Sequence, residues 1–341
     1  MRHTLLQHFQ GALFGGWIGQ VFTDAHPADG AWQILVNHLV DSLSQNLGPI
    51  DWQKVWANWE RSPGEQDTNH IPSLSLSQVF AGLLPIVLFY HENPEKLQQE
   101  LMQANHAMET QWGKDLGLTE KQSLHRQIMI NNLANLIAGL LQEKYNLSQT
   151  FDQQAIFTLL FSQLSAIDPL YQQLLLLQNL LIAGESLHRA IALLETNGKH
   201  LGKEIDFDYQ RYTPILLALY CFCDTPHNSQ IAMQRGLLCP NQQEVIPLLG
   251  ILLGTYHSHS GIPIPWQINN ILPQPSSHVQ TKSPSPDQIA FPQIRQINLM
   301  AEKLWLAWSG FYLPHNNTDG SLYNTNIAIA SCNIMRPRPF R

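Results

Sequence analysis

The spacing of apolar residues constrains the fold more than any other feature of this sequence. Apolar side chains recur three and four positions apart through most of the chain, as at Leu133, Leu136, Ile137, Leu140 and Leu141. Residues at this spacing share one face of an α-helix. Runs that alternate between apolar and polar residues, as half-buried strands require, are nearly absent. The sequence therefore predicts an all-α protein of about a dozen helices without a substantial sheet.

Capping residues indicate where several helices begin and end. A residue that can cap a helix precedes proline at Asn93-Pro94, Asp168-Pro169 and Thr213-Pro214. The cap accepts a hydrogen bond from a free backbone N–H, and proline at the first helical position loses none. Thr119 and Gln122 have the spacing of a capping box. We expect helices to begin at these positions, and the helix from Pro169 to end at Gly184.

The composition narrows the classes of protein. Only 13% of the residues are charged, the net charge is −7, and no run of basic residues occurs, which argues against a nucleic-acid binder. The first 20 residues lack the apolar core of a signal peptide. The longest apolar stretch, 174–183, falls short of the roughly 20 residues that cross a bilayer. We expect a soluble, cytoplasmic protein that binds neither nucleic acid nor membrane.

The four cysteines are too few and too clustered for a disulfide framework in a chain of 341 residues. We expect Cys221, Cys223, Cys239 and Cys332 to be small apolar side chains in a reducing compartment.

A change in composition divides the chain near residue 272. Residues 272–287 are rich in proline and serine, as linkers are. Residues 288–341 contain one more amphipathic helix, followed by a tail without a pattern. We expect this helix to pack on the main domain, residues 1–271, with a surface for a partner protein as the alternative. Its stripe consists of Ile294, Ile297, Ala301, Leu304, Trp305 and Trp308.

Two sets of glycines recur four positions apart, so each set lines one face of a helix. They are Gly11, Gly15 and Gly19, then Gly250 and Gly254. Glycine inside a helix costs roughly 0.5–1 kcal/mol relative to alanine. Repeating it makes sense where a second backbone or a ligand approaches closely, and the sequence leaves both possibilities open.

Three segments, in order, resemble the ADP-ribosylglycohydrolase family, whose members include dinitrogenase reductase-activating glycohydrolase. They are the glycine-spaced helix 11–19, the stretch from Phe80 to Asn105-His106, and the stretch from Ala232 to Trp266. The resemblance covers roughly residues 5–270 and implies a compact orthogonal bundle of helices. It also implies hydrolysis of glycosidic bonds to ADP-ribose, with two Mg²⁺ ions held by carboxylates at helix ends.

The positions that should carry those carboxylates hold other residues. The aspartate after the first glycines falls on Gln20, and the Asp-Asp-Thr triplet falls on Ala31-Trp32-Gln33. The Gly-Asn-Gly turn falls on Leu76-Ser77-Gln78, and the late Asp-x-Asp-Thr falls on Asn241, Gln243 and Glu244. No metal-binding carboxylate is retained in register, so we expect a degenerate member of the family without a metal cofactor. The candidate pocket residues are Gln20, Trp32, Gln33, Ser77, His106, Asn241 and Gln243.

Two hypotheses follow for the function. The first is a catalytically inactive protein that binds an ADP-ribose-like small molecule or a protein partner. The alternative is a divergent hydrolase with a rearranged Mg²⁺ site built from Asp24, Asp29 and Glu244. The structural interpretation of these acids is a helix cap for Asp29 and a surface acid for Glu244. A subunit with a purely structural role is a third possibility.

One other pair of residues has the spacing of metal ligands. His257 and His259 could face one side of an extended segment, but no third ligand is near them in the sequence. We expect solvated loop histidines.

Overall fold

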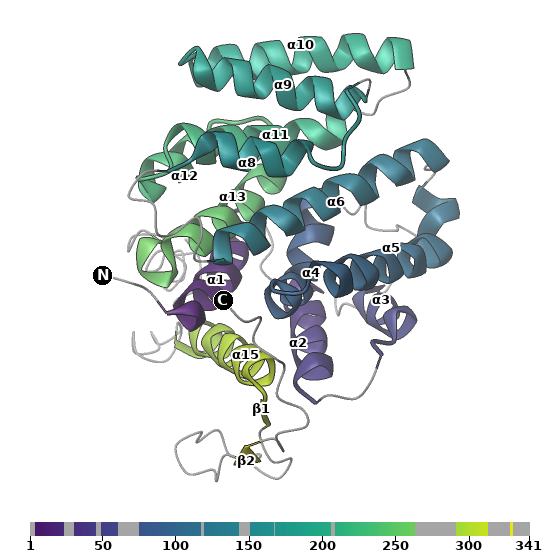
Figure 1. Cartoon of the computed structure of the whole chain (residues 1–341), viewed down its shortest axis with the longest axis vertical. Coiled ribbons are helices and arrows are strands. Elements are labelled where there is room, and N and C mark those ends of the chain that lie inside the picture. Colours follow the sequence, from purple (N-terminus) through teal and green to yellow (C-terminus); the bar gives the residue numbers. More distant parts are fainter. Residues whose placement is uncertain are drawn as a thin grey trace, which may run out of the picture.

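The computed structural model describes residues 4–23, 31–45, 49–60, 75–116, 119–142, 151–166, 168–205, 209–262, 291–312 and 328–329. Within these ranges the fold is all-α, as predicted (Figure 1). The α-helices are α1 (Leu5–Thr23), α2 (Ala31–Ser44), α3 (Trp52–Glu60), α4 (Leu76–Tyr90), α5 (Pro94–Leu116), α6 (Glu120–Leu141), α8 (Gln153–Phe161), α9 (Pro169–Ile182), α10 (Leu187–Ile205), α11 (Tyr209–Asp224), α12 (Ser229–Gly236), α13 (Gln242–His257) and α15 (Phe291–Ser309).

The remaining regular elements are short. A 3₁₀ turn, η1 (His259–Gly261), follows α13. Strand β1 (Phe311–Tyr312) pairs antiparallel with β2 (Ala328–Ile329), with Phe311 opposite Ile329. Two residues a strand do not make a substantial sheet.

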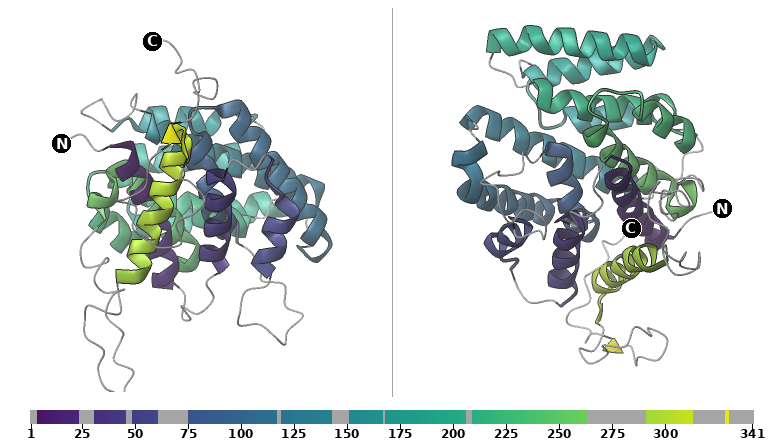
Figure 2. Two further views of the ribbon diagram at one scale, coloured as in Figure 1. Left: turned by 90° about the horizontal axis from the view of Figure 1, so that it is seen from below. Right: turned by 180° about the vertical axis from the view of Figure 1, so that it is seen from behind.

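Helix α13 lies at the centre of the bundle. It packs on α1 and α4 on one side and on α11 and α12 on the other. Helix α15 lies against α1 and α2 (Figure 2). Helix α3 packs on both α2 and α5. Helices α9 and α10 form a hairpin at the far end, where α10 and α9 both contact α11 (Figure 1). None of the described helices is long and apolar enough to cross a membrane.

Most of the predicted helix boundaries are confirmed. Thr119 and Gln122 form a full capping box at the start of α6. The Asp168 carboxylate accepts a hydrogen bond from the N–H of Leu170 at 2.8 Å, and the Asn93 side chain accepts one from Lys96 at 3.0 Å. Helix α9 ends before Gly184, whose φ of +63° lies in the left-handed region that glycine adopts without strain.

The boundary predicted at Thr213-Pro214 is wrong. Helix α11 begins at Tyr209 and continues through Pro214. An internal proline removes one backbone hydrogen bond and crowds the preceding turn, which costs about 3 kcal/mol. Residues 212–223 are all buried, so the packing of a continuous apolar helix outweighs that cost.

The two glycine stripes face each other. A Cβ on Gly15 would overlap the backbone carbonyl of Gly250, and one on Gly11 would overlap that of Gly254. The residue numbers rise along α1 as they fall along α13, so the helices are antiparallel. Close backbone packing, rather than contact with a ligand, therefore explains these glycines.

A single buried core runs through the described helices, and the C-terminal helix contributes to it. Ile297, Ala301 and Leu304 of α15 are fully buried against α1 and α2. The linker 272–287 and most of the tail lie outside the described residues.

The described cysteines belong to this core. Cys221, Cys223 and Cys239 are buried free thiols, and Cys332 falls outside the described ranges.

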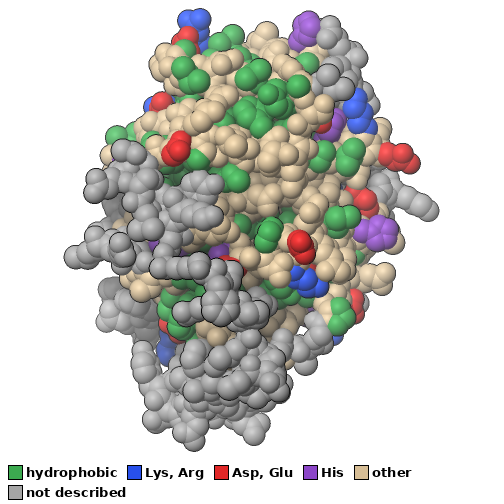
Figure 3. Space-filling model, viewed as in Figure 1, with side chains coloured by type: hydrophobic (Ala, Val, Ile, Leu, Met, Phe, Trp, Pro, Cys, Tyr) green, Lys and Arg blue, Asp and Glu red, His purple; other side chains and the backbone are tan. Residues whose placement is uncertain are grey.

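The surface carries few charges. In the view of Figure 3, acidic and basic side chains are scattered singly among neutral ones, as expected from 13% charged residues. Apolar side chains are exposed at the α9–α10 end, where Ile182 is 72% and Leu193 37% exposed.

Candidate functional site

The antiparallel pair α1 and α13 places the end of one helix beside the start of the other. A Cβ on Gly19, near the end of α1, would overlap the backbone of Pro247 in the second turn of α13. Gln20 follows directly on α1, although its side chain lies outside the described part of the structure. The helix ends that should carry metal ligands in the resembled family thus lie together.

Trp32, at the start of α2, lies beside the same helix pair but farther along it, at Gly16 and Ile251. Its ring atom Cζ2 lies 3.7 Å from the position that a Cβ on Gly16 would take, and Ile251 of α13 lies beside the same position. The indole therefore lies close to α1, where α13 also contacts it. Trp32 is 7% exposed, and its N–H has no hydrogen-bond partner in the described structure. A buried donor without a partner costs about 1–3 kcal/mol.

Gln33, the next residue, points to another helix. Its Nε2 donates to Oε1 of Gln296 in α15 at 2.9 Å. Farther along the same two helices, the Lys303 ammonium lies 3.3 Å from the Asp41 carboxylate. Gln33 therefore helps to join α2 to the C-terminal helix.

The side chain of the residue before α13 does not cap the helix. Asn241 precedes the helix with φ 55° and ψ 48°, a left-handed conformation that asparagine tolerates. Its side chain is exposed and does not cap the helix. Gln243 is also exposed, and Glu244 is half-buried in the first turn. Backbone N–H groups at such an end carry partial positive charge and attract anions.

Ser77 and His106 lie on other helices. Ser77, in the first turn of α4, is fully buried, and its hydroxyl has no hydrogen-bond partner in the described structure. The His106 side chain is exposed on α5, and its backbone carbonyl accepts a hydrogen bond from the Thr110 hydroxyl at 2.8 Å. Of the candidate pocket residues, Trp32 lies beside Gly16 and Ile251, Asn241 and Gln243 lie at the start of α13, and Gln33, Ser77 and His106 lie on α2, α4 and α5.

The acids of the alternative site are only partly visible. Asp24 and Asp29 lie outside the described residues, and Ala31 is described only as the first residue of α2. Glu244 is the one acid of the three with a described position. Within the described ranges no three His, Cys, Asp or Glu side chains gather closely enough to hold a metal ion.

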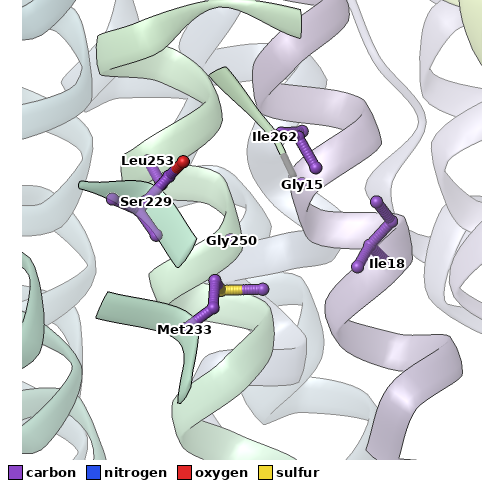
Figure 4. Close-up of a pocket in the computed structure, with 7 residues that line it drawn as sticks. All are labelled: Gly15, Ile18, Ser229, Met233, Gly250, Leu253 and Ile262. Atoms are coloured by element: carbon purple, nitrogen blue, oxygen red, sulfur yellow. The ribbon is translucent and has the colours of Figure 1, made fainter. Parts of the chain in front are cut away.

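A small cavity lies beside the glycine contact. Its volume is about 10 Å³, which is room for one water molecule. The Ser229 hydroxyl at its edge donates to the carbonyl of Gly261. Pockets for ligands the size of a drug measure about 300–1,000 Å³, so this cavity is a packing defect. Figure 4 shows its lining: Gly15, Ile18, Ser229, Met233, Gly250, Leu253 and Ile262.

The histidine pair is half-buried and makes structural contacts, whereas solvated loop histidines were expected. His257 belongs to the last turn of α13, and its ring Nε2 lies 2.5 Å from the carbonyl of Pro226. The ring of His259 packs on Phe14 with centroids 4.8 Å apart. Burial lowers the pKa of His259. Both rings make separate structural contacts, which the local sequence does not reveal because the partners are far away in the chain.

No model of a known protein family matches the chain, and no curated protein matches its sequence. The family resemblance remains a prediction.

Proposed function

We propose that the chain is a catalytically inactive ADP-ribosylglycohydrolase-like protein that binds an ADP-ribose-like molecule without a metal ion. One observation carries the proposal. The end of α1 lies beside the first turns of α13 at Gly19 and Pro247, and Trp32 of α2 lies farther along the same helix pair, beside Gly16 and Ile251; the resemblance expects carboxylates at these three helix ends. They carry Gln20, Trp32, Asn241 and Gln243 instead.

The chemistry of these residues favours binding over catalysis. Mg²⁺ requires oxygen ligands, several of them anionic, and neither an amide nor an indole supplies a negative charge. Amides at Asn241 and Gln243 can exchange hydrogen bonds with ribose hydroxyls. The N-terminus of α13, which the Asn241 side chain does not cap, suits a phosphate group, and the buried N–H of Trp32 has no partner in the described part of the chain.

The net charge and the free thiols of the chain support the same proposal. A net charge of −7 favours a small molecule over a nucleic acid. Three buried free thiols favour a reducing compartment such as the cytoplasm.

Calorimetric titration with ADP-ribose tests the proposal, once in EDTA and once in Mg²⁺. We expect the same affinity in both buffers. Trp32→Phe keeps an aromatic ring but removes the N–H, and should weaken binding about tenfold, as the loss of one hydrogen bond would. Gln103→Ala, at an exposed position of α5, is the matched control and should bind like the wild type.

Two results would contradict the proposal. If ADP-ribose bound in neither buffer, the proposed binding function would be refuted. Release of ADP-ribose from ADP-ribosyl-arginine only in Mg²⁺ would favour the hydrolase instead. In that case Asp24→Asn, Asp29→Asn and Glu244→Gln should each reduce the rate.

A further inference from the structure

Two buried thiols from different elements lie against each other. Sγ of Cys221, in α11, is 3.9 Å from Sγ of Cys239, in the turn between α12 and α13. Helices α11 and α12 pack on each other (Figure 1), so the two cysteines meet although they are 18 positions apart in the chain. Cys223, the remaining cysteine in the described part of the structure, makes no sulfur–sulfur contact there.

Cys239 is the outer thiol of the pair. Its side chain is 3% exposed, yet its neighbours in the turn, Leu238 and Pro240, are both exposed. Solvent is therefore one residue away, and a small movement of the turn lets a molecule the size of water reach the sulfur. Cys221 is fully buried within α11, so it is covered from solvent by the rest of the helix packing.

Hydrogen bonds give the two thiols different roles. The Cys239 S–H donates to the carbonyl of Arg235 at 3.5 Å, which leaves its sulfur to accept from the Cys221 S–H. This hydrogen bond raises the pKa of Cys221 and lowers the pKa of Cys239. A thiolate is the nucleophilic form of cysteine. Cys239 is thus the thiol that an oxidant meets first, and Cys221 is the partner within reach of the product.

We propose that Cys221 and Cys239 form a reversible oxidation site that hydrogen peroxide converts to a disulfide. The Cys239 thiolate attacks one peroxide oxygen and the O–O bond breaks, which gives a sulfenic acid and a hydroxide that takes up the proton released by Cys239. The Cys221 sulfur then attacks the Cys239 sulfur. The S–O bond breaks, and the hydroxyl group leaves as water with the Cys221 proton. Two thiols lose two electrons, and one peroxide becomes two waters.

The positions of the two cysteines allow this bond to form. A disulfide is about 2.05 Å long, so the sulfur atoms must approach each other by about 2 Å. Cys239 lies in the short connection between α12 and α13, where rotation of its side chain and a shift of the turn supply the movement. In a reducing compartment, disulfides of this kind are usually transient and sense oxidants. The site does not require ADP-ribose binding.

Counting thiols before and after excess hydrogen peroxide tests the site, in a Cys332→Ser background. The protein is unfolded directly in Ellman's reagent once the peroxide has been destroyed. We expect three thiols before oxidation, one after it, and three again after treatment with dithiothreitol. Trypsin cuts after Arg235, between the two cysteines. Mass spectrometry should therefore find the fragment that ends at Arg235 linked to the fragment that contains Cys239.

Single substitutions in the same background assign the link. Cys223→Ala is the matched control, because Cys223 shares α11 and a tryptic fragment with Cys221; its two thiols should both disappear on oxidation. Cys239→Ala should keep both of its thiols. Cys221→Ala removes the partner but keeps the outer thiol, so oxidation should stop at a sulfenic acid that dimedone labels. The linked fragments of the unsubstituted protein decide the question even where a variant does not fold.

Four results would overturn the site. The first is a protein that keeps three thiols in peroxide. The second is a link from Cys239 to Cys223, which Cys223→Ala would abolish. The third is higher oxidation of Cys239 without a link, and the fourth is a link between two chains, which electrophoresis without reductant detects. Trp32→Phe should form the disulfide like the wild type, so this site and the ADP-ribose site can fail separately.

Discussion

Single residues decide how closely α1 and α13 approach. Gly15 and Gly16 are neighbours on α1, yet their surroundings differ. A Cβ on Gly15 would overlap the backbone of Gly250, whereas one on Gly16 would lie 3.1 Å from Cγ1 of the Ile251 side chain. Backbone atoms cannot move aside without shifting the helix, but the end of an isoleucine side chain can.

We therefore expect Gly15→Ala to destabilise the protein strongly. Overpacking costs typically about 1–3 kcal/mol, and more where backbone atoms must move. Gly16→Ala should stay within about 1 kcal/mol of the wild type, since alanine is the better helix former. Urea unfolding of both variants measures the difference. Equal stabilities would mean that the helices are not in backbone contact at Gly15.

The buried thiols lead to a second prediction at this scale. Burial raises the pKa of the Cys223 thiol, and a hydrogen bond with Cys239, together with burial, raises that of Cys221. Thiolates are the reactive form; the hydrogen bond with Cys221 lowers the pKa of Cys239, but burial of that side chain, which is 3% exposed, keeps the reagent away. In a Cys332→Ser background we expect no rapid reaction with Ellman's reagent in the native state and three thiols in denaturant. A fast-reacting thiol in the native protein would contradict the packing of α11, which carries Cys221 and Cys223, or of Cys239 after α12.

The sequence predicts which residues share a helix face better than it predicts what each residue contacts. The spacing of Gly11, Gly15 and Gly19 reveals a close approach but not whether a helix or a ligand makes it. Nothing in the local sequence marks Arg126 as buried, because its side chain packs on Met108 of another helix, α5. Short-range patterns report the face of a helix, while partners distant in the chain decide what that face meets.

At the scale of elements, caps were predictable because they depend on neighbours in the chain. Thr119 with Gln122 and Asp168 with Pro169 follow from three or four consecutive residues. The start of α11 did not follow, since tertiary burial of residues 212–223 overrides the preference of Pro214. The candidate site shows the same division. Its helix ends follow from motifs, but the contact of Trp32 with α1 requires the packed structure.

Asp168 joins α9 to α6 and gives a pH-dependent prediction. Burial alone would raise its pKa, but hydrogen bonds from His125 and from the N–H of Leu170 hold it below the ordinary value. A carboxyl group with a lowered folded-state pKa contributes stability above its unfolded pKa of about 3.9 and loses it as pH falls through the folded value. Asparagine keeps the cap but not the charge, so Asp168→Asn should cost about 0.5–1.5 kcal/mol at pH 7, the contribution of one hydrogen bond, and less at pH 3.

Urea unfolding at both pH values measures this difference. Asp152→Asn, at the cap of α8, serves as the matched control because asparagine is an equally good cap. A gap between wild type and Asp168→Asn that is as large at pH 3 as at pH 7 would exclude the charge as its cause.

At the scale of the whole molecule, α15 closes the core although a linker separates it in sequence. Leu304 is fully buried, and the ring of Trp308 packs on Phe9 of α1 with centroids 6.4 Å apart. Removing α15 would expose an apolar face of α1 and α2 to water. The composition of residues 272–287 indicates a domain boundary. Residues on both sides of this stretch nevertheless belong to the same hydrophobic core.

We expect Leu304→Ala to cost about 2–5 kcal/mol, as other large-to-small substitutions in cores do. Lys303→Ala, at the exposed neighbour paired with Asp41, should cost less than about 1 kcal/mol. Unfolding in urea compares the two. Equal costs would mean that α15 contributes little to the core. A chain ending at residue 287 should aggregate, which size-exclusion chromatography would detect.

The contact between α1 and α13 also bears on how the chain is made. Gly15 leaves the ribosome long before Gly250, and the rest of the bundle is synthesised between them. At about 5–20 residues per second the first helix waits roughly 10–50 s for its partner. During that time its glycine face has no neighbour, and contacts so distant in sequence form slowly. The newborn N-terminal helix is therefore the segment on which we expect a chaperone to act.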